Sequence, residues 1–248
     1  MSAVSVAERR PRSPRAHHPA GKGLDRARLV DELAALCKTH AGDDAAFRCA
    51  AVGVLQRALE NGRGEARRAL EAGGTGRACT EALSAQADDL LRVALELVTR
   101  WLAPLDGAAP PSIVAVGGYG RGMLAPGSDI DLLFLLPDKA SPAVEKVVEA
   151  LLYVLWDLKQ KVGHSTRSVE ECLKQARADM TIRTTLIEAR LVTGDKTMFE
   201  TLQSRFDKEI VASGWPRSTA ARACARPSMW RMSAGLASSR TAPAPNWV

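Results

Sequence analysis

The stretch that decides the fold is "VGGYGRGMLAPGSDIDLLFLL", from Val116 to Leu136. It contains five glycines, followed by two aspartates that border or lie within an otherwise apolar run. An apolar run of this length predicts a buried strand, and a buried strand normally excludes carboxylates because their burial is costly. Asp129 and Asp131 therefore indicate a functional site at the start of this strand.

The two aspartates are separated by one residue, so in a strand their side chains project from the same face. They are expected about 6.6 Å apart along the strand, at a rise of about 3.3 Å per residue. Two like charges this close repel each other and resist burial, and a divalent cation relieves both problems. We expect Mg²⁺ as the cofactor, because it prefers carboxylate and phosphate oxygens. Asp129 and Asp131 are the predicted catalytic residues and metal ligands.

The glycines ahead of the aspartates predict a phosphate-binding turn. Gly117 and Gly118 end a short apolar strand, and a backbone without Cβ atoms can approach a phosphate and point N–H groups at it. Ser128 adds a hydroxyl beside the metal ligands, and the Arg121 guanidinium can contact a phosphate oxygen. We therefore predict that Gly117, Gly118, Arg121 and Ser128 bind a nucleoside triphosphate.

Two common glycine-rich nucleotide motifs fit this stretch less well. A P-loop requires a lysine that Gly122 to Ser128, GMLAPGS, does not contain. A dinucleotide-binding fingerprint must open a helix, but Pro126 intervenes and a strand begins at Ile130. The plain structural alternative is a glycine-rich loop capped by Ser128 and Asp129.

The chain divides by composition into four parts. We expect a disordered arm at 1–22, a helical segment at 23–104, a core at 110–212 that contains the glycines and aspartates, and an irregular tail at 213–248. The predicted fold class is α+β, with a small mixed sheet in the core. The tail contains five arginines and no acidic residue. We interpret it as the product of a shifted reading frame in preference to a natural disordered tail.

Within the core, short apolar runs predict strands at 113–116 and 130–136, with a third, shorter one at 162–169. The stretch 141–161 predicts an amphipathic helix with Ser141 as its N-cap. The stretches 168–180 and 184–210 are expected to be helical.

The overall composition favours a reduced, cytoplasmic protein. The net charge of +6 arises from the two ends of the chain, so it does not predict a nucleic-acid partner. Five scattered cysteines form no CxxC pair, which argues against a zinc site or a disulfide framework. The absence of an apolar run of about 18 residues predicts no membrane span.

At these residues the sequence resembles the polymerase-β-type nucleotidyltransferase superfamily. Gly117-Gly118 followed by Asp129-Ile130-Asp131 is similar to that superfamily's signature. Together with "VGHSTRSVEEC" and "TLIEARLVTGD" downstream, it resembles the N-terminal part of the PII uridylyltransferase family over roughly 24–210. The resemblance implies transfer of UMP from UTP to a tyrosine of the signal protein PII, with Mg²⁺, as part of nitrogen regulation.

The sequence departs from that family in ways that leave alternatives open. Family members carry a hydrolytic HD domain and two ACT domains, and we expect neither here, since no His-Asp dipeptide occurs. The chain is then either an active transferase, a catalytically impaired fragment, a nucleotide-binding regulatory module, or a nucleotidyltransferase for another substrate such as glutamine synthetase. A third carboxylate is unassigned among Glu170, Glu171 and Asp179. His164 is a structural histidine, a phosphate contact or an acid–base group.

Overall fold

A computed structural model describes residues 21–105 and 107–212. The predicted tail at 213–248 and all but the last two residues of the predicted arm lie outside the described residues. In the part of the chain that is described, no helix combines the length and the apolar character needed to cross a bilayer.

The N-terminal part is built from three helices, as the apolar periodicity predicts. They are α1 (Arg26–Thr39), α2 (Asp44–Glu71) and α3 (Gly76–Leu97), and α3 continues into a π-helical turn, η1 (Val98–Leu102). Each helix begins at a polar N-cap, whose side-chain oxygen accepts a backbone N–H of the first turn. The three caps are Asp25, Asp43 and Thr75.

Four strands form a mixed sheet in the order β3-β2-β1-β4. They are β1 (Ser112–Ala115), β2 (Ile130–Leu135), β3 (Val162–Arg167) and β4 (Arg190–Thr193). β1 pairs antiparallel with β2 and β4, whereas β2 pairs parallel with β3 through the crossover helix α5 (Pro142–Asp157). The predicted α+β class and small mixed sheet are thus confirmed. Ser141 is the N-cap of α5, as expected.

The expectation of one continuous helical stretch over 184–210 is wrong. The chain there forms α7 (Met180–Ile187), then β4, then α8 (Lys196–Phe206) and a π-helical turn, η2 (Asp207–Val211). β4 is only four residues long and half of it is buried, so its apolar pattern is too short to distinguish a strand from a helix. The helix predicted before it is present as α6 (Val169–Ala178).

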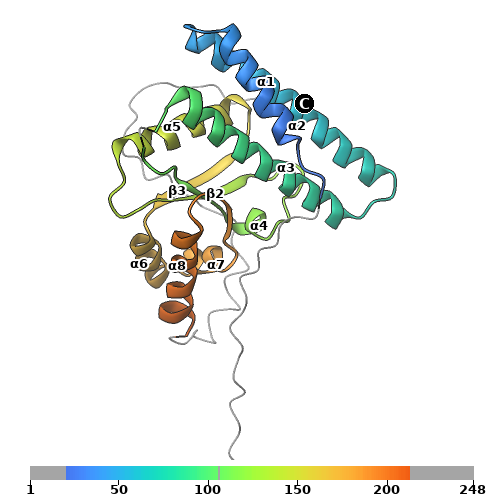
Figure 1. Ribbon diagram of the computed structural model, residues 1–248. Helices are drawn as coiled ribbons and strands as arrows, with labels where there is room; N and C mark the ends of the chain where they lie inside the picture. Colours follow the sequence, from blue (N-terminus) through green and yellow to red (C-terminus); the bar gives the residue numbers. More distant parts are fainter. Residues whose placement is uncertain (1–20, 106, 213–248) are drawn as a thin grey trace, which may run out of the picture. The chain divides into compact units, whose positions relative to one another are not determined.

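The sheet is covered by helices on both faces (Figure 1). One core contains Ile130, Leu132 and Phe134 of β2 together with buried residues of α1, α2, α3 and α5. The other contains Leu133 and Leu135 of β2 together with buried residues of α6, α8 and η2. β2 is therefore apolar on both faces, and Asp131 interrupts the face directed toward the second core.

Candidate functional site

Asp129 and Asp131 lie at the end of the sheet where β1 ends and β2 begins. Asp129 directly precedes β2 and is exposed, whereas Asp131 is the second residue of β2 and is half-buried. The Val116 N–H donates to the Asp131 carbonyl at 3.1 Å, so the end of β1 is held beside the aspartates. Asp131 faces Gly163 of the neighbouring strand β3.

The two carboxylates influence each other electrostatically. Burial raises the pKa of Asp131, and the nearby negative charge of Asp129 raises it further. Neither carboxylate forms an ion pair with a lysine or arginine among the described residues. A half-buried carboxylate next to a second one, without a cationic side chain, is a donor set that a divalent cation fits.

The predicted glycine turn is a single helical turn, α4 (Gly117–Gly120), which follows β1 after one residue. Gly117 has a φ of +61°, in the left-handed region that favours glycine. A Cβ at Gly117 would also lie 3.2 Å from Asp131 Oδ2, so the turn and this carboxylate are direct neighbours. By the geometry of a helix start, the N–H groups of Gly117, Gly118 and Tyr119 have no acceptor within the helix.

Arg121 and Ser128 both have partners in the protein. Arg121 follows α4 and forms an ion pair with Glu188 at 2.5 Å, with both side chains partly exposed. The Ser128 hydroxyl donates to the Ala125 carbonyl at 2.9 Å within the loop that leads to β2. This hydrogen bond uses the hydroxyl proton and leaves oxygen lone pairs to accept from another group.

The three carboxylates considered as a third metal ligand have structural roles in the described fold. Glu170 forms an ion pair with Arg205, Glu171 completes a capping box with Ser168, and Asp179 is the N-cap of α7. Within residues 21–105 and 107–212, no group of three or more His, Cys, Asp or Glu side chains is arranged to hold a metal ion. The site offers the pair Asp129 and Asp131.

His164 lies on the sheet face opposite to Asp131. It pairs in register with Leu132, whereas Asp131 pairs with Gly163. The His164 ring contacts Trp156 of α5 and Phe134 of β2 edge-on, with ring centroids 6.4 and 6.5 Å apart. Burial lowers the pKa of His164, which favours the neutral ring. Of the predicted roles, a structural histidine fits this position better than a phosphate contact or an acid–base group.

Gly163 is a site residue that the sequence reasoning missed. A Cβ added at Gly163 would lie 2.5 Å from Asp131 Oδ1, closer than packed atoms approach. The missing side chain therefore leaves the space that the Asp131 carboxylate occupies. The signal available in the sequence was a glycine inside a predicted strand, which often marks a close approach of another group.

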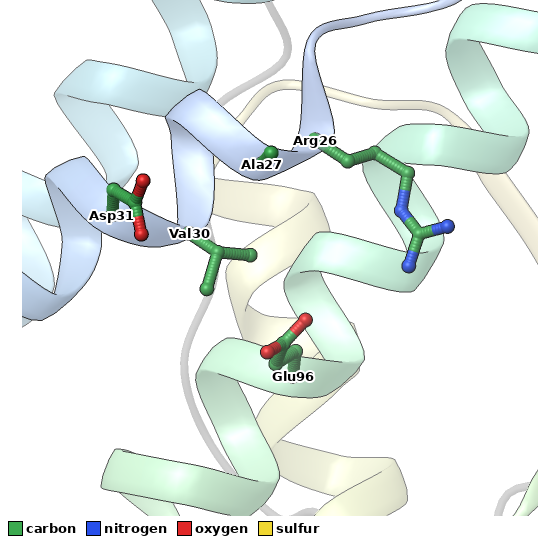
Figure 2. A pocket seen from close by; sticks show the side chains of 5 residues that line it. All are labelled: Arg26, Ala27, Val30, Asp31 and Glu96. Carbon is green, nitrogen blue, oxygen red and sulfur yellow. The ribbon is translucent and has the colours of Figure 1, made fainter.

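A hollow of about 390 Å³ lies elsewhere, between α1 and α3 (Figure 2). Four of its lining residues come from α1 and one, Glu96, comes from α3. It is lined by none of the predicted site residues. The aspartates and the glycine turn, which combine carboxylates with free backbone donors, remain the better candidate for chemistry.

The fold and the site can now be compared with known proteins. The features to be matched are a small mixed sheet and, at one end of it, a glycine turn beside two carboxylates. Residues 97–192 match the family model of the nucleotidyltransferase domain. Most of its length is also similar to proteins named bifunctional uridylyltransferase/uridylyl-removing enzyme. It is 43% identical to the one from Rhodopseudomonas palustris over 86% of this chain, and 45% identical to the one from Nitrobacter winogradskyi over 77%.

A third relative of the same name, from Azospirillum brasilense, is 44% identical over 82% of this chain. The chain spans only 21 to 23% of the length of these three relatives. The resemblance to the uridylyltransferase family inferred from the motifs is thus confirmed, for a segment that corresponds to less than a quarter of each relative.

Proposed function

We propose that this chain provides the nucleotidyl-transfer site of a PII uridylyltransferase, which transfers UMP from UTP to a tyrosine hydroxyl of PII. The observation that carries the proposal is that the Asp131 carboxylate lies beside the glycine turn. Asp131 Oδ2 is 3.2 Å from the position that a Cβ atom at Gly117 would occupy. The relatives' name supports uridylyl transfer, the family resemblance of the motifs suggests PII as the acceptor, and the site has groups that suit this reaction.

Asp129 and Asp131 would hold Mg²⁺, because they are adjacent carboxylates that form no ion pair with a lysine or arginine in the described fold. Bound there, Mg²⁺ would supply charge neutralisation for the triphosphate and lower the pKa of the attacking hydroxyl. Gly117 and Gly118 would present backbone N–H groups to phosphate oxygens. In-line transfer of this kind relies mainly on positioning and on charge stabilisation.

In the reaction, the tyrosine oxygen forms a bond to the α-phosphorus of UTP while the bond to the bridging oxygen breaks, and pyrophosphate leaves. The tyrosine proton passes to solvent. Arg121 would exchange its ion pair with Glu188 for phosphate oxygens, which a guanidinium can also bind through two hydrogen bonds. Ser128 would exchange its hydrogen bond to the Ala125 carbonyl for one donated to a phosphate oxygen. The four reduced cysteines of the described residues suit a cytoplasmic enzyme.

The test is UMP transfer by the purified chain to PII, with UTP labelled at the α-phosphate and Mg²⁺ present. We expect label on PII from UTP in preference to ATP or GTP. Asp129→Asn and Asp131→Asn should each abolish transfer while circular dichroism stays unchanged. The same two changes, made at the matching positions of a full-length relative, separate a defect of the site from weak activity of the short chain.

Two results would contradict the proposal. Full transfer by a chain that carries both asparagine substitutions would exclude the metal-ligand role. Absence of transfer, combined with no rise in the melting temperature when Mg-UTP is added, would exclude the nucleotide site, because a ligand that binds the folded state must stabilise it.

A further inference from the structure

A buried ionic cluster connects helix α3 to the glycine turn. Asp88 of α3, Tyr119 of α4 and Arg190 of β4 are each at most 4% exposed. The Arg190 guanidinium donates to both carboxylate oxygens of Asp88, at 2.6 and 2.9 Å, and the Tyr119 hydroxyl donates to Asp88 Oδ1 at 2.6 Å. We call Asp88, Tyr119 and Arg190 the clamp.

The clamp fixes Tyr119 from two sides. Besides its hydroxyl bond to Asp88, the Tyr119 backbone carbonyl accepts from Arg190 Nη2 at 3.4 Å, and the Arg190 guanidinium lies 5.4 Å from the Tyr119 ring centroid. Burial, followed by the charge of Asp88, raises the pKa of Tyr119 well above its usual value, so the hydroxyl remains a donor. Tyr119 is the third residue of the four-residue turn, so fixing its two ends fixes the turn.

The same face of α3 also hydrogen-bonds to the segment that follows the turn. Ser84 lies four residues before Asp88, hence on the same side of the helix. Its hydroxyl oxygen accepts the Leu124 N–H at 2.9 Å, and Ser84 itself is fully buried. Helix α3 thus binds the chain at Tyr119 and at Leu124, and Arg121 lies between these two anchors.

Helix α3 is also attached to β4 beyond the clamp. Arg92, one turn after Asp88, donates to the Val192 carbonyl through Nε and Nη2, at 3.3 and 3.2 Å. It lies 3.5 Å from Asp88 Oδ2 as well. Helix α3 is therefore also held to β4, the strand that contains Arg190.

We propose that Asp88 is a positioning residue for nucleotide binding, acting through Tyr119 and Arg190 to hold the Gly117–Gly120 turn in the geometry that receives the triphosphate. This inference rests on the proposed function. Asp88 lies outside the matched nucleotidyltransferase domain, residues 97–192. The helical segment then contributes to the site, and it does so through the carboxylate of Asp88.

The most direct test uses Tyr119→Phe in the full chain, because this change removes one hydrogen bond and leaves the Asp88–Arg190 pair in place. We expect the Kd for Mg-UTP to rise about tenfold, the scale of one charge-assisted hydrogen bond, and Tm to fall because the lost bond is buried. Asp88→Asn should raise Kd at least as much. It leaves Arg190 buried without its counter-charge, so Tm should fall as well.

Gln86→Ala is the matched control. Gln86 is on the same helix and is 4% exposed, but its amide donates to the Gly62 carbonyl of α2 at 2.9 Å and not to the turn. A cavity at this site should lower Tm and leave the Kd for Mg-UTP unchanged. If Asp88 has a merely structural role, all three variants should lower Tm and leave the Kd for Mg-UTP unchanged.

Hydrogen exchange of the backbone amides provides a readout that does not depend on the nucleotide. We expect faster exchange over residues 117–124 in Tyr119→Phe and Asp88→Asn, and no change there in Gln86→Ala. Unchanged exchange together with an unchanged Kd in Tyr119→Phe would overturn the positioning role. If the unsubstituted chain does not bind Mg-UTP but the exchange result holds, the proposed function fails and the control of the turn by Asp88 stands.

Discussion

Asp131 carries its charge at a cost in the metal-free protein, because it is half-buried beside Asp129 and its folded-state pKa is raised. A carboxyl with a raised pKa stabilises the fold most below its unfolded value, ordinarily 3.8, and loses that contribution as the pH rises through the folded value. We therefore expect Asp131→Asn to have a higher Tm than the unsubstituted chain at pH 7 without Mg²⁺. The difference should shrink as the pH falls toward 4.

Magnesium should reverse this order. It should raise the Tm of the unsubstituted chain and leave that of Asp131→Asn nearly unchanged, since a ligand stabilises only the state that binds it. Thermal melts at several pH values, with Mg²⁺ or EDTA, check both expectations. A lower Tm for Asp131→Asn in EDTA at pH 7 would mean that the carboxylate has a stabilising partner other than a metal.

Gly163 offers a second test at the scale of one residue. In Gly163→Ala the new methyl group must displace the Asp131 carboxylate, which is the flexible end of a side chain and can move without unfolding the protein. We expect transfer to PII to fall about a hundredfold, the effect of misplacing a reacting group by about 1 Å, with Tm almost unchanged.

The control for Gly163→Ala is Gly53→Ala in α2. A Cβ there would meet only Arg57 Nη1, at an ordinary 3.6 Å. Alanine in a helix interior is favoured over glycine by about 0.5–1 kcal/mol, so this variant should be slightly more stable and fully active. Equal activity of the two variants would show that the space at Gly163 is unimportant for the site.

At the scale of the element, α4 contains glycines that are required for different reasons. A Cβ at Gly120 would lie 2.2 Å from the Glu188 carbonyl oxygen, a backbone atom, so packing alone excludes a side chain there. At Gly118 the nearest atoms are 3.6 and 3.8 Å away, and its φ is outside the left-handed region. The fold therefore tolerates a side chain at Gly118. A ligand bound at the turn gives a reason why this position has no side chain.

This difference gives a prediction for two neighbouring substitutions. Gly120→Ala should lower Tm, whereas Gly118→Ala should leave Tm unchanged and weaken Mg-UTP binding about tenfold, which corresponds to ~1.4 kcal/mol. Thermal melts with and without Mg-UTP measure both quantities. Unchanged Mg-UTP affinity in Gly118→Ala would show that the phosphates do not bind at this turn.

Elements with a long or strongly apolar pattern could be predicted from the sequence. The helices of the N-terminal part and the strand from Ile130 onward follow directly from their periodicity. β4 could not be predicted, because only alternate residues of this short strand are buried, unlike those of the equally short β1, and helical patterns flank it. The candidate carboxylates and Gly117 were found because a single short stretch contains them.

Residues that join the site through tertiary contact were not predictable. Gly163 matters only because β3 pairs with β2 in the register that places it beside Asp131. Asp88 is one of several acidic residues on a helix, and its importance depends on burial against Tyr119 and Arg190. No local pattern marks Asp88, and a glycine inside a predicted strand is the one local sign of Gly163.

At the scale of the whole molecule, the helical segment and the sheet share one core. Leu90, Leu91 and Leu97 of α3 are fully buried in the same cluster as Ile113 and Phe134 of the sheet. We expect a fragment of residues 104–212 to lack a cooperative thermal transition, because one face of its sheet would be exposed. Residues 21–212 should melt cooperatively. Cooperative melting of the shorter fragment would make 110–212 an autonomous domain, as the composition of the sequence suggests.

The clamp also bears on the order in which the site is completed. The two aspartates and the glycine turn belong to one antiparallel hairpin, whose closure is local and entropically cheap. Asp88 and Arg190, in contrast, are 102 residues apart in the chain, so their contact closes a large loop and forms late in folding. A nascent chain that has not yet emerged as far as Arg190 should therefore contain the carboxylates but lack a turn rigid enough to select a nucleotide.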